Sequence, residues 1–319
     1  MMRTLITSLT ALALVLGAAA TAQGTFPNRE VTLVVPVAAG GGSDMVMRAI
    51  ARELEPLLGV PVVVVNRPGA GGAVGLSEVM RAPADGYTLV MITEYNYNLP
   101  ATQDVPFSVD DFVPIATVNF DPAAIGVGSG SALTTIEDFV AFAEANPGVL
   151  TIGNSGFGNI WHIAATAFED AAGLGLVHVP FGGAAPTITA TLGGHISAMV
   201  ASPPEMAAQI EAGTMRLLAT MGIERSVQFP DVPTLREAGF DLQFGTWRGI
   251  GVPKGTPADV VAFLEEAVQQ AAQSQGFIDF MNGRGLGMLY RGSAETAAYM
   301  EADAPRFRAL MAEIGILRQ

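Results

Sequence analysis

The chain has 319 residues, half of them hydrophobic, so it can bury the core of one large domain or two medium-sized domains. Only 14% of the residues are charged and the formal net charge is −14, which argues against nucleic acid and anionic membranes as partners, because both attract basic surfaces. The chain contains no Cys, which excludes disulfides, thiolate chemistry and cysteine-based metal sites.

The first 22 residues have the pattern of a secretory signal peptide. Arg3 is their only charge, LITSLTALALVLGAA is the apolar stretch, and small residues precede the expected cleavage site after Ala22. The apolar stretch is too short for a comfortable membrane span. We therefore expect an exported protein that is not inserted in the membrane.

From residue 31 onward, short β-rich runs alternate with stretches of helical periodicity. We expect strands over 31–37, 60–66 and 88–93, and a helix over 43–58 with Ser43 as its N-cap and Gly59 as its stop signal. Strands that are apolar on both faces and separated by helices predict a parallel sheet covered on both sides.

A second run of β/α units covers residues 123–222, and a helical tail begins at about Pro257. Two runs of this kind predict an α/β protein of two lobes, each a mostly parallel sheet flanked by helices, with a ligand cleft between them. We assign residues 23–122 plus 246–319 to lobe 1 and residues 123–245 to lobe 2. We expect the helical tail to pack on lobe 1.

Two glycine-rich loops, each between an expected strand and an expected helix, are candidate anion sites. Between Arg81 and Arg216 the chain has no Lys or Arg, so an anion held by this segment must rely on backbone N–H groups, hydroxyls, amides or His. Glycine brings backbone N–H groups close to a ligand, and a helix N-terminus favours negative charge. One loop alone is more often an ordinary turn, but two could clamp a carboxylate. The candidate residues are Ala38, Ala39, Gly40, Gly41, Gly42 and Ser43 in the first loop, and Ser155, Gly156, Gly158 and Asn159 in the second.

Further candidates lie next to these loops. Glu94, Tyr95 and Asn96 end an expected strand and would face the mouth of the cleft, although a surface loop is equally consistent with their pattern. Trp161 and His162 follow the second loop, where either cleft lining or packing would explain them. The sequence has no GxSxG, HExxH or Gly-Lys phosphate-loop pattern, and its three His residues lack metal-ligand spacing. We therefore expect no catalytic site, metal or cofactor.

Six segments, in this order, resemble the substrate-binding proteins of tripartite tricarboxylate transporters, the Bug or TctC family: VVPVAAGGGSD, VNRPGAGGAVG, APADGYTLVM, HVPFGGAAPTITATLGG, FPDVPTLREAGF and TWRGIGVPKGTP. The resemblance implies a periplasmic two-lobed binding protein that carries a carboxylated ligand to a membrane permease. It also implies that Ala38 to Ser43 and Ser155 to Asn159 hold a ligand carboxylate, partly through ordered waters. Phe181, which precedes Gly182, is a further candidate ligand-binding residue.

The chain departs from the family pattern at Val37, Gly182, Asn159 and Glu94. We therefore hypothesise that Glu94 meets an amine or amide donor of the ligand, or else ordered water. The expected function is capture of a small carboxylate, namely a di- or tricarboxylate, an acidic amino acid or an aromatic acid, by a monomer whose lobes close on a hinge. The alternatives are a sensor that presents its closed form to a signalling receptor and, less in keeping with the sequence, an exported α/β enzyme.

Overall fold

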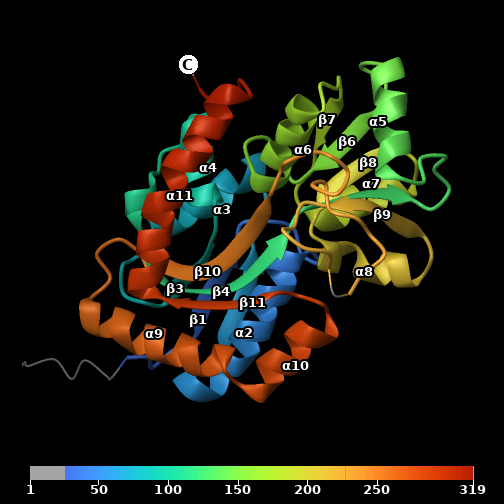
Figure 1. Cartoon of the computed structure of the whole chain (residues 1–319). Coiled ribbons are helices and arrows are strands. Elements are labelled where there is room, and N and C mark those ends of the chain that lie inside the picture. The colour runs from blue at the N-terminus through green and yellow to red at the C-terminus, as the bar shows by residue number, and fades with distance from the viewer. Residues whose placement is uncertain (1–25, 227, 319) are drawn as a thin grey trace, which may run out of the picture.

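The computed structural model describes residues 26–226 and 228–318, so the predicted signal peptide over residues 1–22 lies outside the described residues. Two separate β-sheets, each flanked by helices, divide these residues into two lobes (Figure 1). The two-lobed α/β fold expected from the alternating pattern is confirmed. Among the described residues, no helix is both long and apolar enough to cross a membrane.

The sheet of lobe 1 has six strands in the order β11-β4-β10-β3-β1-β2. β1 pairs in parallel with β2 and β3, whereas β10 pairs antiparallel with β3 and β4, and β11 pairs antiparallel with β4. The sheet is therefore mixed rather than mostly parallel, because β10, which returns from lobe 2, and β11 run against the other four strands. The strand bounds are β1 Val31–Val35, β2 Val62–Asn66, β3 Thr88–Ile92, β4 Phe112–Pro122, β10 Gly245–Pro253 and β11 Met288–Gly292.

The sheet of lobe 2 has five strands in the order β7-β6-β8-β5-β9. β6 pairs in parallel with β7 and β8, and β5 pairs antiparallel with β8 and β9. This sheet is mixed because β5, which follows β4 of the other lobe, runs against the other four strands. The strand bounds are β5 Ala124–Gly128, β6 Thr151–Asn154, β7 Val177–Pro180, β8 Ala198–Ala201 and β9 Met215–Thr220.

Helices cover both sheets, and three of them follow β10 (Figure 1). α9 and α10 pack against α2, and α11 packs against β4 and α4, so the C-terminal helices lie on the six-stranded sheet as expected. The helix bounds are α2 Gly42–Leu58, α3 Ala73–Met80, α4 Tyr95–Thr102, α5 Ile136–Ala145, α6 Ile160–Ala171, α7 Ala184–Leu192, α8 Pro203–Glu211, α9 Ala258–Ala272, α10 Gln275–Gly283 and α11 Ser293–Glu313, with short 3-10 turns at Ala70–Gly72 and Val109–Asp111.

The start of α2 differs from its prediction. Gly41, not Ser43, is the N-cap. Because glycine has no side chain, the cap residue offers no side-chain acceptor to the first N–H groups of the helix. The predicted stop is confirmed, because Gly59 adopts the left-handed conformation with φ of 69°. α2 therefore presents backbone N–H groups at its N-terminus that its cap residue does not satisfy.

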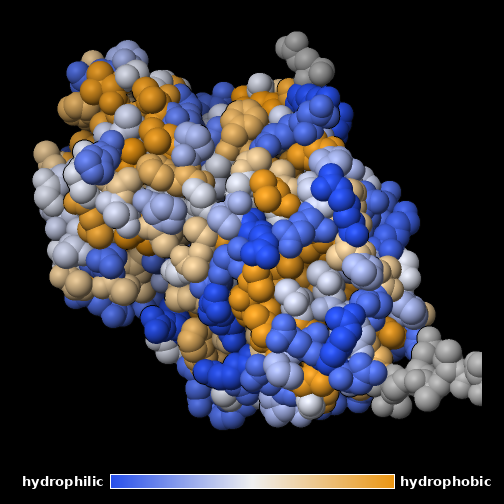
Figure 2. Space-filling view, turned by 180° about the vertical axis from the view of Figure 1, so that it is seen from behind, coloured by the Kyte–Doolittle hydropathy of each residue, from blue (hydrophilic) through white to orange (hydrophobic). Residues whose placement is uncertain are grey.

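The surface seen from behind shows hydrophobic residues in scattered patches among hydrophilic ones on both lobes (Figure 2). Such a distribution is ordinary for a folded protein, because polar atoms cannot cover the whole surface.

Candidate functional site

Each of the two glycine loops lies against the opposite lobe. The N–H of Ala38 donates to the carbonyl of Gly182 over 2.9 Å, and a Cβ on Gly41 would lie 3.5 Å from that of Ala184. A Cβ on Gly156 would lie only 2.7 Å from the Cα of Gly71. The loops thus meet the facing lobe at two separate places, as the cleft prediction requires, but these contacts do not bring one glycine loop against the other.

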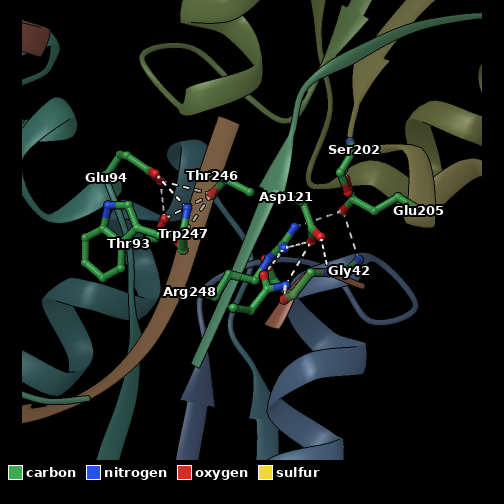
Figure 3. A network of polar contacts seen from close by, with 12 residues as sticks. Gly42, Thr93, Glu94, Asp121, Ser202, Glu205, Thr246, Trp247 and Arg248 are labelled. Atoms are coloured by element: carbon green, nitrogen blue, oxygen red, sulfur yellow. Dashed lines mark hydrogen bonds and ion pairs between the residues drawn. The ribbon is translucent and has the colours of Figure 1, made fainter. Parts of the chain in front are cut away.

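Two carboxylates of the protein accept hydrogen bonds from backbone N–H groups of the first loop. The N–H of Gly40 donates to Oδ2 of Asp44, and the N–H of Gly42 donates to Oε1 of Glu205, each over 2.9 Å. Glu205 comes from α8 of the other lobe (Figure 3). Among the described residues, the N–H groups of Gly41 and Ser43 have no hydrogen-bond partner. The ligand contacts expected of Gly40 and Gly42 are therefore replaced by internal ones in this structure.

The second loop also satisfies its own donors. The N–H of Gly156 donates to Oδ1 of Asn154 over 3.0 Å, and that of Gly158 donates to Nδ1 of His162 over 3.2 Å. Burial, aided by the nearby His178, lowers the pKa of His162 to about 4, so its ring is neutral near pH 7 and can accept this bond. Three predicted ligand contacts, those of Gly156, Gly158 and His162, thus stabilise the loop in this structure.

Asn159 is the N-cap of α6 rather than a free donor. Its Oδ1 accepts a hydrogen bond from the N–H of Trp161 over 2.9 Å, and its amide donates to the carbonyl of Ser155. Both ends of this side chain thus make local hydrogen bonds, and its contact with a ligand stays a prediction. Trp161 is only 2% exposed and belongs to the hydrophobic core.

Glu94 forms a buried polar network next to the lobe junction (Figure 3). Its carboxylate accepts hydrogen bonds from the N–H of Trp247 over 2.9 Å, from the hydroxyl of Thr246 over 3.0 Å and from that of Thr93. Burial raises the pKa of Glu94 to about 7, although the hydrogen bonds from Thr93 and Trp247 oppose this rise. The donors that Glu94 meets in this structure are thus protein groups, and its contact with a ligand donor or ordered water stays a prediction.

Tyr95 and Asn96 are buried at the start of α4. The ring of Tyr95 would lie 2.9 Å from a Cβ on Gly72, so it packs against that turn. Burial raises the pKa of Tyr95, as does the charge of Glu205. Asn96 accepts a hydrogen bond from the N–H of Thr93 over 3.1 Å through Oδ1.

Arg248 was not predicted, yet it lies at the centre of the polar contacts between the lobes (Figure 3). It is 1% exposed, its Nε donates to the hydroxyl of Ser43 over 3.0 Å, and its Nη1 donates to Asp121. Its Nη2 lies 3.8 Å from Oε1 of Glu205. Burial by itself would lower the pKa of Arg248, but the carboxylates of Asp121 and Glu205 raise it above its ordinary value. The sequence signal was a lone arginine inside the apolar run TWRGIGV.

Two asparagines that were not predicted carry buried polar atoms without partners. Both amide atoms of Asn98 and the Nδ2 of Asn154 have no hydrogen-bond partner among the described residues, and both side chains are fully buried. Because unpaired buried amides are costly, such groups call for an explanation. The sequence signal for Asn98 was an amide inside YNYNLPAT, which forms α4.

The face of α4 that carries Asn98 is turned toward lobe 2. Thr102, one turn after Asn98 on the same face, has its Oγ1 2.1 Å from where a Cβ on Gly158 would be. Next to it, Nε2 of Gln103 donates to the carbonyl of Phe157 over 2.5 Å. The unpaired amide of Asn98 is thus buried one helical turn from the contact between the lobes.

A cavity of about 370 Å³ opens at this junction. Its wall combines the turn over 69–72 and Gln103 from lobe 1 with two segments of lobe 2 over 155–157 and 180–182. Ser155 and Phe181, both predicted as ligand contacts, line it. Within residues 26–226 and 228–318, His and acidic side chains form no group of three or more suited to a metal ion.

The sequence profile of TctC, the tripartite tricarboxylate transporter family receptor, matches residues 46–316. The chain belongs to this family. A relative from Cupriavidus necator, the UPF0065 protein in the gbd 5′ region, is 31% identical over 294 residues, covering 92% of this chain and 90% of the relative.

Solved structures agree with the TctC assignment. The periplasmic binding protein BugD superposes with a TM-score of 0.88 at 30% identity, covering 92% of this chain and all of BugD. MatC from Rhodopseudomonas palustris with bound malate gives a TM-score of 0.85 at 27% identity, covering 89% and 99% of the two chains. This TctC chain is therefore a solute-binding protein with the fold of periplasmic receptors, and not an enzyme.

Proposed function

We propose that this TctC chain captures a small carboxylate between its lobes and delivers it to the membrane permease of a tripartite transporter. One observation carries the proposal, namely the unpaired amide of Asn98, buried beside the contact between the lobes. A ligand would supply the partners that the protein does not. The malate bound to MatC supports a carboxylate as the class of ligand.

The chemistry of the unpaired atoms fits an acid. The Nδ2 groups of Asn98 and Asn154 are donors, and a carboxylate is an acceptor with several lone pairs. The Oδ1 of Asn98 is an acceptor and calls for a hydroxyl or amine on the same ligand. The free N–H groups of Gly41 and Ser43 remain available as further donors, which keeps part of the glycine-loop prediction.

Export and lobe closure complete the proposed function. The signal peptide is cleaved after Ala22, and the mature protein acts in the periplasm. Lobe 1 consists of residues 23–122 plus 246–319 and lobe 2 of residues 123–245, so the hinge lies at the two connections between them. Ligand binding shifts the equilibrium toward the closed form, which the permease recognises.

The test is calorimetric titration of the protein with a panel of aliphatic and aromatic mono-, di- and tricarboxylates. The same titrations are made with Asn98→Leu, which keeps the shape of the side chain but removes its amide. A hydrogen bond to a charged group is worth about 1.5–3 kcal/mol, so affinity should fall at least about tenfold. Asn282→Leu, at an exposed position of α10, is the control and should bind as the wild type does. Unchanged affinity in Asn98→Leu would place the ligand elsewhere, and no binding of any carboxylate would refute the proposed function.

A further inference from the structure

Glu205 is held in place by its own helix while it reaches across to the other lobe. It lies in the first turn of α8, and its Oε2 accepts hydrogen bonds from both the N–H and the hydroxyl of Ser202, over 2.9 and 3.0 Å. Its Oε1 then accepts the N–H of Gly42 at the start of α2. This carboxylate thus occupies the position at the N-terminus of α2 where a ligand anion was expected from the sequence.

The charges around Glu205 do not balance. The side chains of Glu205, Arg248 and Asp121 are 4%, 1% and 1% exposed, and they carry one positive and two negative formal charges. Nη1 of Arg248 is paired with Asp121, while Nη2 makes only the long contact of 3.8 Å with Glu205. The buried cluster therefore has a formal charge of −1, and water is too far away to screen it fully.

The charged cluster lies at one end of the α4 face that carries Asn98. Trp247, the residue before Arg248, donates its backbone N–H to Glu94, the N-cap of α4, over 2.9 Å, so the start of α4 lies close to the cluster. Asn98 follows three residues later, about 5 Å along the helix, and Thr102 at the far end meets the second glycine loop. A ligand of four to six carbons held at Asn98 would therefore extend toward Glu205.

We propose that Glu205 is a specificity-determining residue, which makes this receptor select ligands with a single carboxylate and an uncharged or cationic far end. The inference rests on the proposed function, because it takes the ligand carboxylate to be held at Asn98. A second ligand carboxylate would approach an excess of buried negative charge, and the anion position at α2 is already filled by Glu205. A hydroxyl, amide or amine at the far end would meet no such repulsion.

The experiment compares ligands of equal chain length by calorimetry: hexanoate, 6-aminohexanoate and adipate, and the corresponding four-carbon set butyrate, 4-aminobutyrate and succinate. In the wild type, the monocarboxylate or amino acid of a set should bind at least ten times more tightly than the dicarboxylate. Glu205→Gln keeps the size of the side chain and removes its charge, so the preference should fall at least tenfold. Glu205→Met, which buries no unpaired polar end, is the second variant in case Glu205→Gln folds poorly. It should lower the preference over the dicarboxylate in the same way. Glu211→Gln, at the exposed end of α8, should leave the preference unchanged.

The outcomes separate the two proposals. Tightest binding of the dicarboxylate by the wild type, or an unchanged preference in both Glu205 variants, would overturn the role of Glu205. If Asn98→Leu still abolished binding, the proposed function would stand. Failure of the wild type to bind any of the six acids would overturn the specificity proposal, and failure across the whole carboxylate panel would overturn the proposed function as well.

Discussion

The raised pKa of Glu94 predicts a pH-dependent stability that Glu94→Gln should remove. Burial raises this pKa from 4.5 to about 7, so the folded state holds the proton more tightly than the unfolded state. The contribution of Glu94 to the free energy of unfolding must therefore fall as the pH rises from 4.5 to 7, and it stays constant outside that window. Each pKa unit is worth about 1.4 kcal/mol, so the total loss is about 3 kcal/mol.

The assay is urea denaturation of the wild type and of Glu94→Gln between pH 4 and pH 8. Gln keeps an acceptor for the N–H of Trp247 but carries no charge. The stability of the variant relative to the wild type should increase by about 3 kcal/mol across this range, mostly between pH 4.5 and 7. Taking the difference between the two proteins cancels the titration of all other groups.

A matched surface variant controls for the loss of one carboxylate. Glu144→Gln, at an exposed position of α5, should follow the wild type at every pH. If the difference between Glu94→Gln and the wild type varied by less than about 1 kcal/mol from pH 4 to 8, the carboxyl would not have the perturbed pKa that its burial implies.

Two further predictions concern the contact between the lobes and its buried charges. Gly158 and Gly148 have nearly the same left-handed backbone conformation, with φ of 74° and 75°. A Cβ at Gly158 would lie 2.1 Å from Oγ1 of Thr102, whereas a Cβ at Gly148 would meet no atom within 4 Å. Gly158→Ala should therefore weaken ligand binding at least about tenfold relative to Gly148→Ala, because only the former opposes closure; equal affinities in calorimetry would contradict this. Asp121→Asn leaves Arg248 without its close ion pair and should lower the free energy of unfolding by about 3 kcal/mol, whereas a loss below about 1 kcal/mol in urea denaturation at pH 7 would show that Asp121 does not stabilise the buried guanidinium.

The elements were largely predictable because their signals are local. The apolar runs that became β1 and β3, and the stop of α2 at Gly59, depend only on neighbouring residues. The start of α2 was predicted one residue late, since the pattern does not show that Glu205, 163 residues away, accepts the N–H of Gly42. Capping by a distant residue cannot be recognised from a local motif.

The sequence predicted that both glycine loops lie at the lobe junction, but not the hydrogen bonds made there. Both glycine loops do lie where the lobes meet, and the helix that starts at Tyr95 faces the junction. The sequence does not show which backbone donors already have partners within the protein. The N–H of Gly156, for example, donates to the side chain of Asn154, two residues earlier. The sequence pattern singled out Glu94 among the acids, whereas only the hydrogen bond from the N–H of Gly42 shows that Glu205 reaches across to the other lobe.

The place of β10 in the six-stranded sheet sets the order in which the protein can assemble. β10 separates β4 from β3, so β1, β2 and β3 cannot join β4 until Gly245–Pro253 has been synthesised. The five-stranded sheet, by contrast, is drawn entirely from Ala124 to Thr220 and can form earlier. A chain halted before Gly245 would expose β3 and β4 as open sheet edges, which are prone to aggregation, so this receptor depends on a late strand to protect its earliest ones.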